Sequence, residues 1–128
     1  MSDKRVVRTE AAPAPFQGAP YSQAIAAGGF VFVSGQLGLK PADTAISGGI
    51  EEQTEQVFAN LKAILDEAGS GLDRLVKTTV FLQHLDDFQA MNAVYSKHIG
   101  EQPPARATVE VAKLPSGALV EIEAIALL

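Results

Sequence analysis

Apolar and polar residues recur along the chain with the period of a helix in two segments. From Ile50 to Ala68, apolar side chains return every three or four residues, glutamates occupy the first turns and Gly69 follows, which together predict a helix. A second helix is expected to begin at Asp86 as its N-cap and to end at Gly100. The apolar stripe of this second helix, in which Asn92 is a polar exception, consists of Phe88, Met91, Tyr95 and Ile99.

Segments rich in β-branched and aromatic residues predict strands around these helices. One runs from Phe30 to Ser34 between glycines, and another extends from Leu75 to Leu82. Two more strands are expected over residues 106–111 and 119–127, on either side of a Pro115-Ser116-Gly117 turn. Strands, helix, strand, helix and two strands in this order are typical of an α+β domain with both helices packed on one face of a sheet.

The length of the chain suits a single domain, residues 1–128, of which residues 1–19 form a short N-terminal arm. No internal repeat or low-complexity linker divides it. The predicted arrangement leaves the second face of the sheet uncovered, in a chain of which 47% of the residues are apolar. We therefore expect copies of the chain to cover that face in a closed homo-oligomer.

The charge balance narrows the classes of partner. Lysine and arginine number 10 against 15 acidic residues, a formal net charge of −5, and the basic residues do not cluster, which disfavours a nucleic-acid partner. Cysteine is absent, so the chain has no disulfide, no thiol nucleophile and no thiolate metal ligand. Residues 1–15 lack the apolar segment of a secretory signal, and no apolar run approaches the roughly 20 residues that span a bilayer. These features predict a soluble, cytoplasmic protein.

The last two predicted strands carry charged side chains. Because alternate side chains of a strand face opposite sides, Arg106, Thr108 and Glu110 share one side of the first strand. Glu121 and Glu123 likewise share one side of the second. An arginine that keeps its proton, near a carboxylate that can exchange one, is suited to binding a small acid and moving a proton on it. A structural ion pair between Arg106 and one of these three glutamates is the alternative. The pattern alone leaves both open, and it does not say which of Glu121 and Glu123 would be functional.

A series of short segments follows in a characteristic order and spacing. These segments are Pro20-Tyr21-Ser22-Gln23-Ala24, Val33-Ser34-Gly35-Gln36, Val76-Lys77-Thr78-Thr79-Val80-Phe81, Met91-Asn92-Ala93-Val94-Tyr95, Pro104-Ala105-Arg106 and Glu121-Ile122-Glu123-Ala124-Ile125-Ala126. None is specific alone, but together they cover nearly all of the chain after the arm. In this order they resemble the reactive intermediate deaminase (Rid) family, close to its archetypal imine and enamine deaminase subgroup.

The resemblance implies a chorismate-mutase-like α+β fold with a mixed sheet, assembled as a homotrimer with its sites in the clefts between subunits. Family members of this type hydrolyse 2-imino acids, such as 2-iminobutanoate, 2-iminopropanoate and the 2-aminoacrylate tautomer, to 2-keto acids and ammonia, with no cofactor or metal. Carried over to this chain, Arg106 would bind the substrate carboxylate and Glu121 would position the hydrolytic water. The substrate pocket would also include Tyr21, Ser34, Gly35, Asn92 and Thr108.

Ordinary structural roles compete with pocket roles at these positions. The alternatives are ring packing for Tyr21, backbone capping for Ser34 and a core amide for Asn92. Thr108 departs from the family pattern, since some relatives have cysteine two residues after the arginine. No thiol can act there, and we expect the position to contribute mainly through its backbone.

A function from another class also fits these residues, namely a binding or regulatory trimer that holds a small carboxylic acid without converting it. An endoribonuclease or translation inhibitor, also described in this family, ranks lower because the chain is acidic and has no histidine pair placed for RNA cleavage. His84 and His98 have no partner at ligand spacing, and we expect surface positions for them rather than roles as metal ligands or bases.

Overall fold

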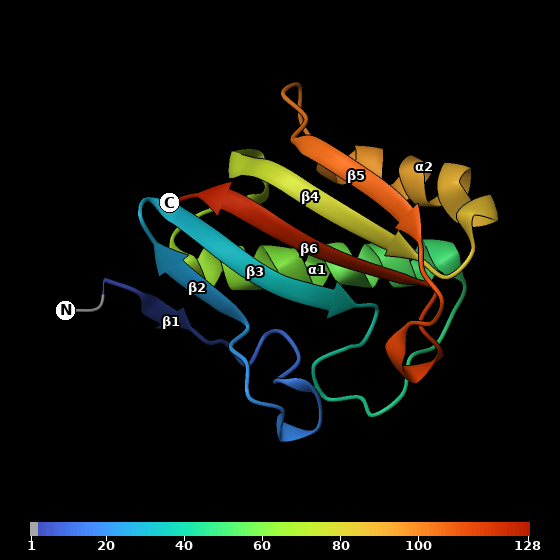
Figure 1. The fold of residues 1–128 in the computed structure, drawn as a ribbon, viewed down its shortest axis with the longest axis horizontal. Helices are drawn as coiled ribbons and strands as arrows, with labels where there is room; N and C mark the ends of the chain where they lie inside the picture. Colours follow the sequence, from blue (N-terminus) through green and yellow to red (C-terminus); the bar gives the residue numbers. More distant parts are fainter. Residues whose placement is uncertain (1–2) are drawn as a thin grey trace.

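The computed structural model describes residues 3–128, and in this part of the chain six strands form one sheet beside two α-helices (Figure 1). The strands are β1 (Arg5–Val7), β2 (Ala24–Ala27), β3 (Phe30–Leu37), β4 (Leu75–Leu82), β5 (Ala105–Glu110) and β6 (Val120–Leu127). The helices are α1 (Ile50–Ala68) and α2 (Phe88–His98), with short 3-10 turns at residues 16–18, 72–74, 85–87 and 115–117.

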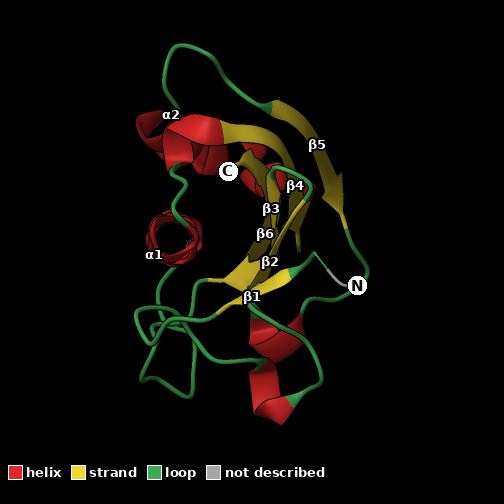
Figure 2. Cartoon of the chain, turned by 90° about the vertical axis from the view of Figure 1, so that its left-hand side faces the viewer, coloured by secondary structure: helices red, strands yellow, loops and turns green. Residues whose placement is uncertain are grey.

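The last strand of the chain lies inside the sheet rather than at its edge. The strand order is β1-β2-β3-β6-β4-β5, so β6 pairs with both β3 and β4. All neighbouring strands are antiparallel except β4 and β5, which are parallel. Both helices lie on the same side of the sheet, as Figure 2 shows, and no described helix covers the other side, called the open face below. The predicted α+β class, with two helices on one face, is confirmed.

Local signals place α1 and β4 where the pattern predicts them. The helix α1 ends at Ala68 because Gly69 adopts a left-handed backbone with φ of 88°, which glycine tolerates best. At its start, the Glu52 carboxylate accepts a hydrogen bond from the Gly49 N–H at 3.1 Å, which satisfies a donor that the helix cannot pair. The bounds of β4, Leu75–Leu82, also match the prediction.

Other elements differ from the prediction for identifiable reasons. The strands β1 and β2 were not predicted, since one is only three residues long and the other is mostly alanine; they form because their backbones pair with each other and with β3. The prediction of Asp86 as the N-cap of α2 is wrong. Residues 85–87 form a 3-10 turn, held by the Glu110 carboxylate, which accepts a hydrogen bond from the Leu85 N–H, and α2 begins at Phe88. The helix ends at His98, because Ile99 is already extended.

The core lies between the helices and the sheet. Phe58, Leu61, Ile64 and Leu65 of α1 are fully buried, as their helical spacing requires. They face alternate residues of the inner strands, which are buried on this side: Val31 and Val33 of β3, and Val120, Ile122, Ala124 and Ala126 of β6. The intervening residues of β6, beginning with Glu121, therefore face the open side.

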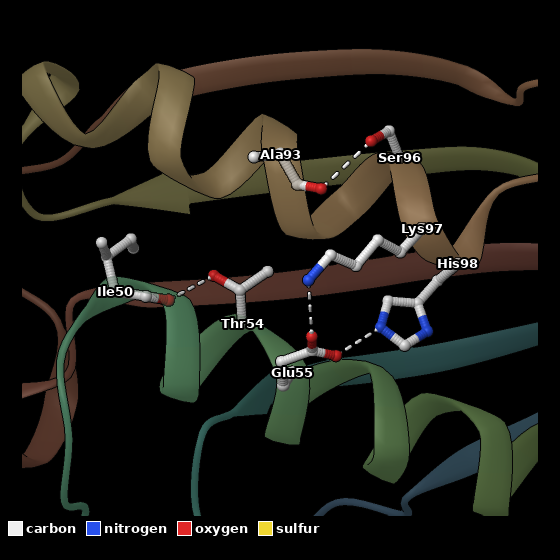
Figure 3. Close-up of polar contacts among 7 residues, drawn as sticks. All are labelled: Ile50, Thr54, Glu55, Ala93, Ser96, Lys97 and His98. Atoms are coloured by element: carbon white, nitrogen blue, oxygen red, sulfur yellow. Dashed lines mark hydrogen bonds and ion pairs between the residues drawn. The ribbon is translucent and has the colours of Figure 1, made fainter.

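A polar cluster connects the two helices (Figure 3). The Glu55 carboxylate of α1 lies 2.6 Å from Nε2 of His98 and 3.5 Å from Nζ of Lys97, both in the last turn of α2. The His98 ring also stacks on Phe58, with centroids 4.6 Å apart. His98, which we expected at the surface, is only partly exposed and links the helices. The hydrogen bond from His98 lowers the pKa of Glu55, partial burial opposes this, and the charges of His98 and Lys97 lower the pKa further.

The substitution Glu55→Gln should lower the free energy of unfolding at pH 7 by about 0.5 kcal/mol, the scale of an exposed ion pair. Because folding lowers the Glu55 pKa below 4.5, its stabilisation is complete above that pH and is lost as the pH falls through the folded-state pKa. Urea unfolding of the wild type and of Glu55→Gln at pH 7 and at pH 3 measures the difference in unfolding free energy at each pH. A loss of unfolding free energy that is as large at pH 3 as at pH 7 would contradict the role of the Glu55 charge. So would an equal loss for Glu67→Gln, on the exposed side of α1.

Candidate active site

A cleft of about 510 Å³ opens on the side of the sheet away from the helices. It lies between the loop that precedes β2, the end of β3 and the start of β6, three segments that can be followed in Figure 1. Four residues that the resemblance assigned to the substrate pocket line it: Tyr21, Ser34, Gly35 and Glu121. Its other lining residues are Pro13, Ala14, Phe16, Ala19, Gln23, Gln36, Leu37, Leu39, Pro115 and Glu123.

An irregularity in β3 shapes the floor of this cleft. The register between β3 and β6 shifts between Val33 and Gln36, which are both buried and pair with Ala124 and Ile122. The two residues between them, Ser34 and Gly35, therefore lie at a β-bulge and line the cleft instead of continuing the alternation. Bulges of this kind commonly redirect side chains at functional sites.

Gly35 makes room for the Glu121 carboxylate. A Cβ atom at position 35 would overlap the carboxylate oxygen Oε2, so any larger residue would displace this group. Partial burial raises the pKa of Glu121, and the negative charge of Glu123 raises it further. A carboxyl group with a raised pKa can exchange a proton nearer neutral pH than an ordinary glutamate.

Tyr21 and Ser34 differ in the hydrogen-bonding capacity that they leave for a ligand. The Tyr21 hydroxyl accepts a hydrogen bond from the Phe16 N–H at 2.7 Å, so its own proton remains available to the cleft. The ring is 45% exposed, which favours pocket lining over core packing. Ser34 donates its hydroxyl proton to the Ser22 carbonyl at 2.6 Å, which is the capping role considered above, and retains only acceptor capacity.

Arg106 lies on the opposite face of the sheet, against α2. In the parallel pairing of β4 with β5 it is opposite Thr78, whose buried hydroxyl is 2.7 Å from the Tyr95 hydroxyl. Its guanidinium carbon lies 4.7 Å from the centre of the Tyr95 ring and 5.5 Å from that of Phe88. Within residues 3–128, no hydrogen bond or ion pair involves the Arg106 side chain. The alternative of an ion pair with Glu110, Glu121 or Glu123 is therefore not realised in the described chain.

Asn92 and Thr108 belong to the same side as Arg106. Asn92 lies on α2 at the helical spacing that shares a face with Phe88 and Tyr95, and its buried Oδ1 has no hydrogen-bond partner among the described residues. Thr108 is two residues after Arg106 on β5, so its side chain shares that face, and it is partly exposed. The seven candidate residues thus form two groups on opposite faces, one around Glu121 and one around Arg106.

Sequence reasoning assigned no role to Gln23, which supports the wall of the cleft. Its buried amide forms hydrogen bonds with the backbone of Thr9, Ala12 and Pro13, so it fixes the loop that carries part of the cleft lining. Its position inside the Pro20–Ala24 segment was the available signal. Between residues 3 and 128, no three histidine or acidic side chains converge as a metal site would require. No helix in this range is long and apolar enough to cross a membrane.

Comparisons with known proteins agree with this architecture. The sequence model of the family described as Endoribonuclease L-PSP matches residues 9–128. A RutC family protein of Pyrococcus abyssi is 52% identical over 124 residues, which cover 96% of each chain. Reactive Intermediate Deaminase A, chloroplastic, of Arabidopsis thaliana is 48% identical over 126 residues, which cover 98% of this chain and 66% of the relative. The chain belongs to the Rid family.

One solved structure that resembles the chain contains a ligand. The crystal structure of E. coli TdcF with bound serine matches the chain with a TM-score of 0.89 and 35% identity, over 97% of this chain and 99% of that one. The names given to members of the family differ, since the family model is named for an endoribonuclease and one relative for a deaminase. Membership therefore establishes the family and the fold, and the reaction has to be argued from the site.

In this Rid protein, Gly35→Ala should move the Glu121 pKa down towards the ordinary value of 4.5, because the new methyl group pushes the carboxylate into water. Carbon-13 NMR titration of the glutamate carboxyl groups measures the change. Since the displaced group is the end of a flexible side chain, the free energy of unfolding should change by less than about 1 kcal/mol.

Two further glycines serve as controls for this substitution. Gly38→Ala should cost about 1–3 kcal/mol of stability, because its Cβ would lie 2.7 Å from the Cα of Gln53 in the backbone of α1. Gly100→Ala should change neither property, since nothing described lies within 4 Å of a Cβ there. An unchanged Glu121 titration in Gly35→Ala would show that the carboxylate does not depend on this space.

Proposed function

We propose that the protein is a cytoplasmic imine deaminase that hydrolyses 2-imino acids, such as 2-iminobutanoate and 2-iminopropanoate, and their enamine tautomers, such as 2-aminoacrylate, to 2-keto acids and ammonia. The observation that carries the proposal is the separation of its two charged groups. Arg106 has no anionic partner in the described chain, and Glu121 keeps a raised pKa in a cleft on the opposite face. Each group is therefore available for a ligand. A second copy of the chain can place its Arg106 beside the Glu121 cleft of the first, so that one site contains both groups.

The proposed assembly is a homotrimer with its sites between subunits. Phe30 and Phe32 of β3 and Leu127 of β6 are about 40% exposed and lie on the open face, where Leu127 pairs with Phe30. An apolar surface of this kind favours contact with another protein surface over water. In the proposed trimer, the edge strand β5 of one subunit, which carries Arg106, lies beside the Glu121 cleft of the next subunit.

The Arg106 group suits the carboxylate end of the substrate. A guanidinium binds a carboxylate through two parallel charge-assisted hydrogen bonds, which fix the position of the neighbouring carbon. Relatedness supports the ligand class, because the serine bound to the E. coli relative carries a carboxylate on the carbon that also bears its nitrogen. The unpartnered Oδ1 of Asn92 is an acceptor suited to an N–H group of the same ligand.

Glu121 suits the hydrolytic step. Water attacks the carbon of the C=N bond while the ionised carboxylate accepts its proton. The carboxylate returns this proton to the nitrogen, which gives a carbinolamine with a hydroxyl and an amino group on the same carbon. The hydroxyl proton then moves to the nitrogen as the C=O bond forms and the C–N bond breaks, so that one water is consumed and one ammonia is released for each 2-keto acid. Tyr21 retains a hydroxyl proton that can be donated to the oxygen or nitrogen formed in this step.

The substitution Arg106→Ala should lower kcat/KM by about 100-fold, the scale of a lost hydrogen bond to a charged group. 2-Aminoacrylate is generated from serine by a dehydratase, and pyruvate formation is followed with and without the protein. Glu121→Gln should reduce kcat, whereas Glu123→Gln, on the same strand and face, should retain most of it. Identical rates with and without the wild-type protein, together with saturable 2-keto acid binding, would support a non-catalytic carboxylate-binding trimer instead.

Mixing two impaired variants tests the location of the site. If each site takes Arg106 from one subunit and Glu121 from its neighbour, random mixed trimers of Arg106→Ala and Glu121→Gln contain both native residues at about one site in four. Activity should therefore reappear after the two proteins are refolded together, with native mass spectrometry to verify the mixed trimers. Mixed trimers without recovered activity would place the site within a single chain.

A further inference from the structure

We propose that Tyr95 and Phe88 form an aromatic platform that orients the Arg106 guanidinium for the carboxylate, and that both are positioning residues of the site. The inference rests on the proposed function, because it concerns the residue that is to bind the substrate. It adds a role for two side chains of α2 that the periodicity of the sequence assigned only to an apolar stripe.

The contacts of Arg106 are the first argument. Its guanidinium carbon lies 4.7 Å from the Tyr95 ring centre and 5.5 Å from that of Phe88, both within the range of a cation–π interaction. A ring face attracts the positive charge without supplying the oxygen acceptors that an ion pair would provide. Because no carboxylate pairs with Arg106 within residues 3–128, the rings hold the charge while N–H donors remain for a ligand.

The anchoring of Tyr95 is the second argument. The ring is only 6% exposed and packs edge-on against Phe58 of α1, with centroids 5.3 Å apart. Its hydroxyl is 2.7 Å from the hydroxyl of Thr78, the residue directly opposite Arg106 in the strand pairing. The ring is therefore fixed both to the helix core and to the strand beside Arg106, so it defines where a stacked guanidinium can lie.

Phe88 completes the platform from the first turn of α2. It is 36% exposed, so most of the change caused by its replacement should fall on the contact with Arg106 rather than on the core. Tyr95, in contrast, belongs to the core, and its replacement tests packing and positioning together. The two residues thus provide one variant that spares the fold and one that removes the closer ring.

The test compares the binding of 2-oxobutanoate and of its methyl ester by calorimetry, because only the acid offers the carboxylate. Phe88→Leu should weaken binding of the acid about threefold and Tyr95→Leu about tenfold, while binding of the ester changes little. Tyr95→Phe keeps the ring and loses the Thr78 contact, so it should bind the acid within about twofold of wild type despite a lower melting temperature. Ile64→Val, which trims the core under α1 and makes no ring contact with Arg106, should leave the preference for the acid unchanged.

The outcomes separate the two proposals. Wild-type protein that prefers the acid, with the same preference in Phe88→Leu and Tyr95→Leu, would overturn the platform alone. Weaker binding of acid and ester by the same factor would also overturn it, because that is the behaviour of a general loss of packing. Wild-type protein that binds neither compound would overturn the proposed function and the platform with it.

Discussion

The register with which β4 pairs with its two neighbours is the constraint on which the whole site depends. On one side Thr78 is opposite Arg106, and on the other Phe81 is opposite Glu121. Thr78 and Phe81 are an odd number of residues apart, and paired residues share a face, so Arg106 and Glu121 must point to opposite sides of the sheet. A shift of one residue in either pairing would bring both charges to the same face, where they could neutralise each other.

Because Arg106 and Glu121 lie on opposite faces of the sheet, the charge state of each is set by its own neighbours. Arg106 stacks on rings of α2, which stabilise its charge without supplying a carboxylate. Glu121 is partly buried beside Glu123, and both burial and this neighbouring charge raise its pKa, so the proton is held more tightly than in an ordinary glutamate. If the two groups formed an ion pair within the chain, the attraction would lower the Glu121 pKa and occupy the guanidinium.

The size and charge of the site also help to choose between the two activities named in the family, deaminase and endoribonuclease. A cleft of about 510 Å³ matches a small molecule, and its charged wall consists of Glu121 and Glu123, which would repel a phosphate backbone. Arg106 on the ring platform is a partly exposed cation in an acidic chain, which fits the proposed small carboxylate ligand better than RNA. The support for this arginine reaches back through Tyr95 and Phe58 to the cluster that joins α1 and α2, so the helix layer contributes to the site although the cleft lies on the other face.

Local sequence determined the elements whose signals are contained within them. The spacing of apolar residues predicts α1, the β-branched run predicts β4, and the alternation in β6 predicts that Glu121 and Glu123 share a face. Tertiary structure decided the rest. The short strands β1 and β2 exist because partners pair with them, and the start of α2 moved to Phe88 because the distant Glu110 holds the preceding turn. Arg106 was recognisable from its motif, but its separation from Glu121 was not, because a strand's own pattern fixes which residues share a face while only pairing across the sheet fixes which face that is.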